Sequence, residues 1–250
     1  MRATATLLLT AVLLALAVIA LAPSVLIGTR ISEATSGRLR LMDTEGVLWN
    51  GRGTLALANA RTPVTWSVQG SDLLRGRLTL QLNAEGAAAR VPAGTLSASG
   101  DGIAASGIEA LVPAQALWSA FATAKGIALG GDLMLSVKQL EQRRGSLTGQ
   151  VELTWQRASA VLMPGRKTLD LGEVRLALAA DGTQLTGPIE NVGGSVALRG
   201  NLTLTSGQGS AGSVLITPRG GADADLAGFL AAVGKPESGG WRVDWRTGTR

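Results

Sequence analysis

One stretch decides the fold: in Arg77-Leu78-Thr79-Leu80-Gln81-Leu82, polar and apolar side chains alternate strictly. Successive side chains of a β-strand point to opposite faces, so this stretch predicts a half-buried strand. The same alternation recurs at 38–41, 54–57, 132–137, 173–178 and 201–204, with turn signals at 83–86, 130–131, 181–182 and 193–194. The chain beyond residue 37 is therefore predicted to be mainly β, as an extended or curved antiparallel sheet that is sandwich-like or groove-like.

Two later segments have helical spacing instead. Residues 113–124 begin with a proline, which suits the first turn of a helix, and residues 223–233 begin with Asp223 and stop before Gly234. Each is predicted to be a short helix that closes the end of a sheet. A possible division places 37–126 in one half of the domain and 127–250 in the other.

The first 29 residues are predicted to be a membrane anchor. Residues 3–29 contain no charged side chain, and 7–26 are long enough for a helix of ~30 Å, the thickness of a bilayer's hydrocarbon core. Ala20-Leu21-Ala22 resembles a signal-peptidase site, but Pro23 would then be the first mature residue. An uncleaved signal anchor is favoured over a cleaved signal peptide, with the β-rich part, 37–250, exported to the periplasm of a bacterium.

Composition excludes most enzyme chemistry. The 250 residues include no cysteine and no histidine, so disulfides, thiolate ligands and His-dependent nucleophiles are ruled out. The net charge is +5, but adjacent basic residues are few and lie beside turns, which does not favour nucleic-acid binding. We therefore predict a protein that is not an enzyme and that has no cofactor, no metal and no nucleic-acid partner.

The tryptophans carry nearly all of the aromatic content, and one lies in an unusual setting. The segment Gly46-Val47-Leu48-Trp49-Asn50-Gly51-Arg52 places a tryptophan before Asn-Gly, the pair favoured in type I′ hairpin turns. We predict that Asn50 and Gly51 form this turn with positive φ. Trp66 and Trp155 fall within predicted strands, where an indole more often packs in a core than binds a ligand.

This segment resembles the hallmark of the type II secretion system protein N family, a Gly-Thr-Leu-Trp-Asn-Gly-like motif early in the exported domain. Val47 stands where the family usually has threonine. Similar elements follow in order, at 64–66, 73–78, 149–158, 171–172 and 226–234. The motif residues singled out, as structural or interaction residues, are Gly46, Leu48, Trp49, Asn50, Gly51, Arg52, Trp66 and Trp155.

The resemblance implies an accessory inner-membrane subunit with one N-terminal helix and a periplasmic domain. It would take part in the export of folded proteins across the outer membrane, through contacts with other subunits of the secretion system. A second hypothesis, from similarity of architecture, is an AsmA-like envelope protein whose apolar β-groove binds or transfers lipid. A third is a secreted hydrolase, released by cleavage after Ala22.

We expect Trp49→Ala to lower the melting temperature of the domain that lacks residues 1–29. Removal of a buried tryptophan typically costs ~3–5 kcal/mol, a large share of a domain's ~5–15 kcal/mol. Gly51→Val should act likewise, through strain at positive φ. If Trp49 were instead an exposed recognition site, thermal melts would be unchanged and only binding or secretion would be lost.

Overall fold

The computed structural model describes residues 32–33, 37, 39–57, 60–73, 75–86, 90–121, 128–161, 168–205, 209–220 and 224–247. The predicted anchor, 1–29 with its helix at 7–26, lies outside these residues. Among the helices that are described, none has both the length and the apolar character needed to cross a membrane.

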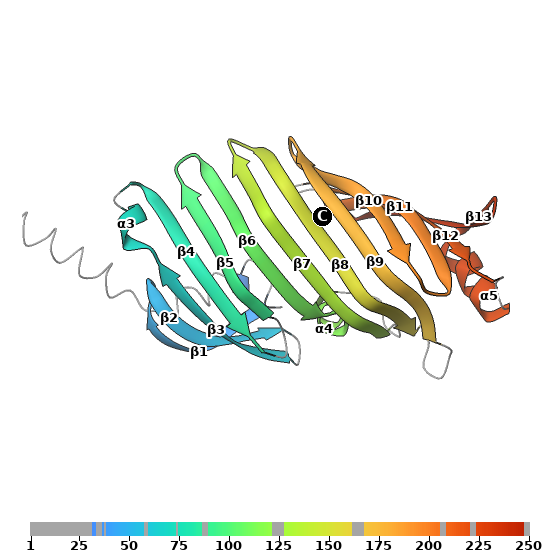
Figure 1. Ribbon diagram of the computed structural model, residues 1–250, viewed down its shortest axis with the longest axis horizontal. Coiled ribbons are helices and arrows are strands. Elements are labelled where there is room, and N and C mark those ends of the chain that lie inside the picture. The colour runs from blue at the N-terminus through green and yellow to red at the C-terminus, as the bar shows by residue number, and fades with distance from the viewer. Residues whose placement is uncertain are drawn as a thin grey trace, which may run out of the picture.

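The predicted fold class is confirmed in its main part, because the described chain forms one large antiparallel sheet (Figure 1). Its strands follow one another in chain order, except that β14 lies between β12 and β13. The strands are β1 (Leu39–Val47), β2 (Asn50–Leu57), β3 (Ala60–Val68), β4 (Arg77–Glu85), β5 (Arg90–Ser99), β6 (Gly102–Pro113), β7 (Ala128–Arg143), β8 (Ser146–Val161), β9 (Thr168–Asp181), β10 (Gln184–Val192), β11 (Val196–Thr205), β12 (Gly209–Pro218), β13 (Lys235–Glu237) and β14 (Gly240–Thr247).

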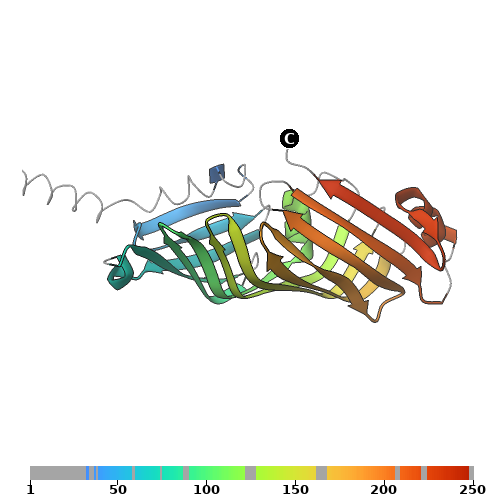
Figure 2. The ribbon, with the colours of Figure 1, turned by 90° about the horizontal axis from the view of Figure 1, so that it is seen from above.

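The sheet is strongly curved and forms a single layer (Figure 2). Strands β9 and β11 contact each other across β10. Leu202 and Leu204 of β11 pack against the buried cluster of Val137, Val151 and Leu178. This packing across intervening strands places the apolar side chains on the inner side of the curve, while the described residues form no second sheet to cover them.

Among the described residues from 39 to 247, three short helices accompany the sheet, where the sequence predicted two. The predicted helix at 113–124 is α4 (Ala114–Phe121), and the one at 223–233 is α5 (Ala224–Val233). α4 contacts both β2 and β7, so it bridges strands far apart in the sheet from the inner side of the curve. The helix that was not predicted, α3 (Gly70–Leu73), has a single turn and therefore too few residues to show a period.

β-bulges keep apolar side chains on the inner face along the longest strands. In β7, Val137 pairs with Val151, and the register then shifts by one residue before Leu140. Without this shift Leu140 would face outward, because strand side chains alternate at every residue. The extra residue is Lys138, whose ammonium lies 3.3 Å from the carboxylate of Glu152. One inserted polar residue thus keeps Leu140 on the apolar side.

The predicted Asn50-Gly51 turn is wrong. The hairpin loop consists of Leu48 and Trp49, and Asn50 and Gly51 are already paired residues of β2. Neither has a positive φ; in this hairpin positive φ values belong to Asp43, at 50°, and Gly46, at 91°. An Asn-Gly pair is a local signal, and here the pairing of β2 with both neighbours overrides it.

Gly51 instead makes room for the ring of Trp66 on β3. The two residues are register partners, and a β-carbon on Gly51 would collide with that ring and lie 2.7 Å from the carbonyl oxygen of Glu45. Trp66 is only 4% exposed, and its indole N–H donates a 3.2 Å hydrogen bond to the carbonyl of Leu48. Gly51→Val is still expected to destabilise the domain, but because valine would displace a buried indole.

A second predicted turn, Gly130-Gly131, also lies inside a strand. β7 runs through both glycines, and its pairing with β8 is irregular there. Gly131 has a φ of 88°, and a β-carbon on it would collide with the carbonyls of Gln156 and Arg157. The two glycines therefore belong to a β-bulge in which the backbones of β7 and β8 approach each other closely. The turn predicted at 83–86 likewise starts within β4, whereas 181–182 and 193–194 do lie where strands end.

The proposed division at residue 126 falls in 122–127, outside the described residues. On either side of it, β6 and β7 pair from Gly102 with Arg143 to Pro113 with Asp132. Backbone hydrogen bonding therefore continues across this point of the chain. The division into two halves stays a prediction.

Asn191 joins three strands near one end of the sheet. Its side-chain amide donates hydrogen bonds to the carbonyls of Leu171 at 2.7 Å, Val196 at 2.9 Å and Gly193 at 3.3 Å. Its side-chain oxygen accepts a 2.7 Å hydrogen bond from the backbone N–H of Leu198. One side chain thereby provides hydrogen-bond partners for four backbone groups near the β10–β11 turn, where the regular pairing of the two strands ends.

We expect Asn191→Ala to lower the free energy of unfolding by roughly 2 kcal/mol, because partly buried backbone groups lose their partners. The matched control is Asn201→Ala, an exposed asparagine of β11, which should change stability by no more than ~0.5 kcal/mol. Urea unfolding of the domain measures both values. Equal effects of the two substitutions would contradict the role assigned to Asn191.

Candidate functional site

The inner face of β4 to β8 carries two rows of mostly apolar residues that run across the strands. Register pairing places Leu78, Ala98, Ile103, Gln142 and Leu147 in one row, and Leu80, Leu96, Ala105, Leu140 and Gly149 in the next. Neighbouring strands lie ~4.8 Å apart, so five strands extend over roughly 19 Å. The rows lie toward the edge formed by the β5–β6 and β7–β8 hairpins, at the opposite end of β6 from α4 (Figure 1).

A cavity of about 360 Å³ lies over these rows. We call it the apolar trough, and define it by its lining: Leu78, Leu80, Leu96, Ser97, Ala98, Ile103, Ala104, Ala105, Leu140, Gln142 and Leu147. β5 and β6 contribute Ala98 and Ala105 beside the larger Leu96 and Ile103, between leucines of β4 on one side and of β7 and β8 on the other. The cavity lies where the two alanines leave room between these longer side chains.

Large apolar side chains of the trough reach solvent. Ile103 is 58% exposed, Leu78 40% and Leu96 36%. Contiguous exposed apolar surfaces are uncommon on soluble domains and are typical of binding sites. The volume also lies within the ~300–1,000 Å³ range of small-molecule sites.

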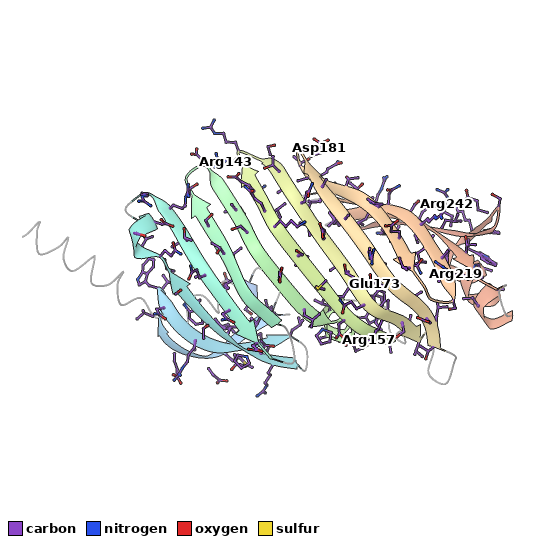
Figure 3. All side chains as sticks on the ribbon, in the orientation of Figure 1. Arg143, Arg157, Glu173, Asp181, Arg219 and Arg242 are labelled. Atoms are coloured by element: carbon purple, nitrogen blue, oxygen red, sulfur yellow. The ribbon has the colours of Figure 1, made fainter. Side chains whose placement is uncertain are left out.

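Arginines lie at the hairpin end of the trough. Arg77 directly precedes Leu78, and none of the described carboxylates forms an ion pair with it. Arg143 lies at the edge of the sheet (Figure 3), where it pairs with Glu141. Arg144 approaches Asp101 at 3.5 Å, with both side chains well exposed. Arg77 and Arg143 alternate with Leu78 and Gln142, so their side chains lie on the face of the sheet opposite the trough.

The trough offers no acid–base or metal chemistry. Its described lining contains no titratable side chain, and no group of potential metal ligands occurs among the residues that the structure places. A lowered pKa is found at Glu237, where Arg242 donates a hydrogen bond to the carboxylate, and the same bond raises the pKa of Arg242. That pair joins β13 to β14 at the far edge of the sheet. The arrangement suits binding by shape and apolar contact.

The structure brings most of the predicted motif together in one hairpin. Gly46, Leu48, Trp49, Asn50, Gly51 and Arg52 lie in or beside the β1–β2 turn, and Trp66 packs on them from β3. The guanidinium of Arg52 pairs with Glu45 at 2.5 Å, with both side chains largely exposed. Among the motif side chains, Asn50 and Arg52 are the exposed ones.

Two predicted tryptophans have different surroundings. Trp49 is half-buried in the turn, and its carbonyl accepts a 2.6 Å hydrogen bond from the N–H of Val68. Trp155 lies on β8, far along the sheet, where its indole N–H donates a 2.8 Å hydrogen bond to the carbonyl of Gly130. The structure therefore does not bring Trp155 to the hairpin, and the effect of Trp49→Ala stays a prediction.

The trough residues were not singled out from the sequence, apart from the alternating run at 77–82. An alternating strand shows that one face is apolar but does not show whether a second layer covers it. The signal that could have found the floor is the small-residue content of 97–98 and 104–105 beside leucine-rich strands. To use that signal, one must know which residues of neighbouring strands lie opposite each other. This register is set by the pairing of strands in the folded sheet.

The comparisons with known proteins agree with the motif series. The family model described as type II secretion system (T2SS), protein N, matches residues 37–243, which is most of the chain. No curated protein and no solved structure matches it. The matched region starts just before β1 and ends within β14, so it takes in the described sheet except residues 244–247 of β14. The chain belongs to the type II secretion system protein N family.

Proposed function

We propose that this chain is an accessory subunit of the type II secretion system that acts through protein–protein contacts and not through catalysis. The family match over 37–243 carries the proposal. The described lining of the trough adds support, because it holds no titratable group. In this proposal residues 1–29 anchor the chain in the inner membrane, and 37–250 lie in the periplasm.

The β1–β2 hairpin is the contact surface that we propose for other subunits. Trp66 of β3 is buried and packs on Gly51 of β2, which holds the hairpin in shape. Asn50 and Arg52 then remain exposed at a fixed position, with the Arg52 side chain 72% exposed. Rigid scaffolding beneath exposed polar groups is a common arrangement at binding sites.

Deletion of the gene should reduce the amount of exported protein that reaches the medium, with accumulation in the periplasm. The full chain supplied from a plasmid should restore export, and a tagged copy should recover other secretion subunits from detergent-extracted membranes. Quantitative mass spectrometry of medium, periplasm and recovered material measures both. Normal export in the deletion strain, together with recovery of no secretion subunit, would contradict the proposal.

Asn50→Ala combined with Arg52→Ala should lower the recovery of other subunits several-fold, while the melting temperature stays unchanged. The ion pair that is lost is exposed, and such pairs contribute only ~0–1 kcal/mol. Arg199→Ala is the matched control, since this arginine is exposed on β11 away from the hairpin. If both variants recover subunits equally well, the hairpin is not the contact surface.

A further inference from the structure

We propose that the open edge of β14 pairs with β14 of a second copy of this chain, so that the two sheets join in a symmetric dimer. This inference does not rest on the contacts proposed above for the β1–β2 hairpin. β13 pairs with residues 240–242 of β14, so residues 243–247 have β12 on one side and none of the described strands on the other. In Figure 2, β14 runs along the margin of the sheet, and β13 and α5 lie near its beginning.

The backbone groups left unpaired along this edge belong to Asp244 and Arg246. Pro236 of β13 has no N–H, so hydrogen bonds to β14 are formed by the residues on either side of it, whose partners are Gly240 and Arg242. Successive residues of a strand direct their N–H and C=O groups to opposite sides, so Asp244 and Arg246 also direct theirs away from β12. The edge therefore offers two N–H and two C=O groups to another strand.

The opposite edge of the sheet, β1, is interrupted. Its pairing with β2 shifts register between Met42 and Glu45, and Asp43 within this bulge has a φ of 50°. Bulges of this kind are a common way in which proteins prevent unwanted pairing at a sheet edge. β14, in contrast, pairs with β12 from residue 241 to residue 247 without a register shift. It is a regular strand that a second regular strand can extend.

The charges on the edge of β14 are self-complementary. In an antiparallel pair of two β14 strands with the two-fold axis at Trp245, Asp244 of each copy lies opposite Arg246 of the other, and Val243 lies opposite Thr247. Both charged side chains are exposed, and neither forms an ion pair with another described residue. The residues that face each other as opposite charges are also those whose backbone groups point outward in both copies. Backbone and side chains thus favour the same register.

This register also keeps the apolar faces of the two sheets on one side. Opposite residues of paired strands point to the same face, so Val243 and Trp245 of both copies lie on the inner side. The ring of Trp245 leans over Gly212 of β12, away from the open edge, so the two indoles do not collide at the axis. The length fits as well, because β13 occupies the edge beside 240–242 and β14 ends at Thr247.

We expect the dimer to be weak and reversible. Only residues 243–247 of each copy pair, far fewer than the ~20–30 residues a side of a standard stable interface. The contact is isologous, so it uses the β14 edge of both copies and closes at two chains. The structure thereby predicts a dimer and not a filament.

The first experiment uses cross-linking, because the chain contains no cysteine of its own. In Trp245→Cys the two thiols would face each other at the axis, in a pair without mutual hydrogen bonds whose α-carbons approach to ~4.5 Å, which a disulfide can span. Trp241→Cys is the matched control, since this half-buried tryptophan of the same strand lies opposite β13 of its own chain. The full chains are oxidised in detergent with copper phenanthroline and examined by non-reducing electrophoresis.

Trp245→Cys should yield at least about tenfold more disulfide-linked dimer than Trp241→Cys, because the control thiols would lie far apart in the dimer. Thermal melts establish that both variants are folded. If Trp245→Cys melts at a lower temperature, a mixture of Val243→Cys and Thr247→Cys replaces it, since these two positions face each other between copies.

The second experiment exchanges charges. Asp244→Arg and Arg246→Asp each place like charges opposite each other, so the dimer fraction of either variant alone should fall at least about tenfold. An equal mixture of the two variants should form mixed dimers at the wild-type level, because every opposing pair is again oppositely charged. Arg199→Asp, at an exposed position of β11, should leave the dimer fraction unchanged. Native mass spectrometry of chains with tags of different mass measures each fraction.

Three outcomes would overturn the proposal. They are equal cross-linking of Trp245→Cys and Trp241→Cys, a charge-exchanged mixture with no more dimer than either variant alone, and linkage of the β14 edge to a different polypeptide. The measurements require this chain alone and no other secretion subunit. Their failure therefore leaves the protein-contact proposal to its own tests.

Discussion

Everything in the described fold depends on the burial of apolar side chains by a sheet that has no second layer. A strand can present one face to a core only if an element lies opposite that face, and here the described residues provide only α4 and the curvature of the sheet itself. Curvature brings β9 and β11 together across β10, which lets Leu202 and Leu204 pack on the buried cluster that includes Leu178. The inner face therefore packs on itself where Leu202 and Leu204 meet the buried cluster, and stays open at the trough.

The longest strands maintain this arrangement through irregular residues. Strict alternation over sixteen residues, the length of β7 and of β8, requires every second residue to be apolar. The bulge at Lys138 relaxes that requirement, because one extra residue returns Leu140 to the inner face and leaves a charge pointing outward. Bulges also increase local twist, so the same insertions that preserve the apolar face contribute to its curvature.

Much of this fold could be predicted from the sequence, because alternation and helical periods are local. The strands around 77–82 and 173–178, and the helices α4 and α5, lie where the patterns predicted them. The errors concern glycine. At Gly51 and Gly131 the need for glycine comes from a neighbouring strand, an indole in one case and two carbonyls in the other, and a local pattern contains no information about either. The trough was not located for the same reason, since its floor exists only through the register of β5 with β6.

The distribution of tryptophan explains why the hollow lies where it does. A one-layer sheet can fill space on its inner face only with side chains that lean over neighbouring strands, and indole is the largest of these. Trp66 lies over Gly51 near one edge of the sheet, and Trp245 lies over Gly212 near the other. In both pairs glycine provides the room that the ring occupies, a known way to compensate for glycine in a strand. Between Leu78 and Leu147 the row holds Ala98, Ile103 and Gln142, and none of the described indoles lines the cavity above it. Indoles thus fill space on the inner face near both ends of the sheet, while the face over β4 to β8 stays open.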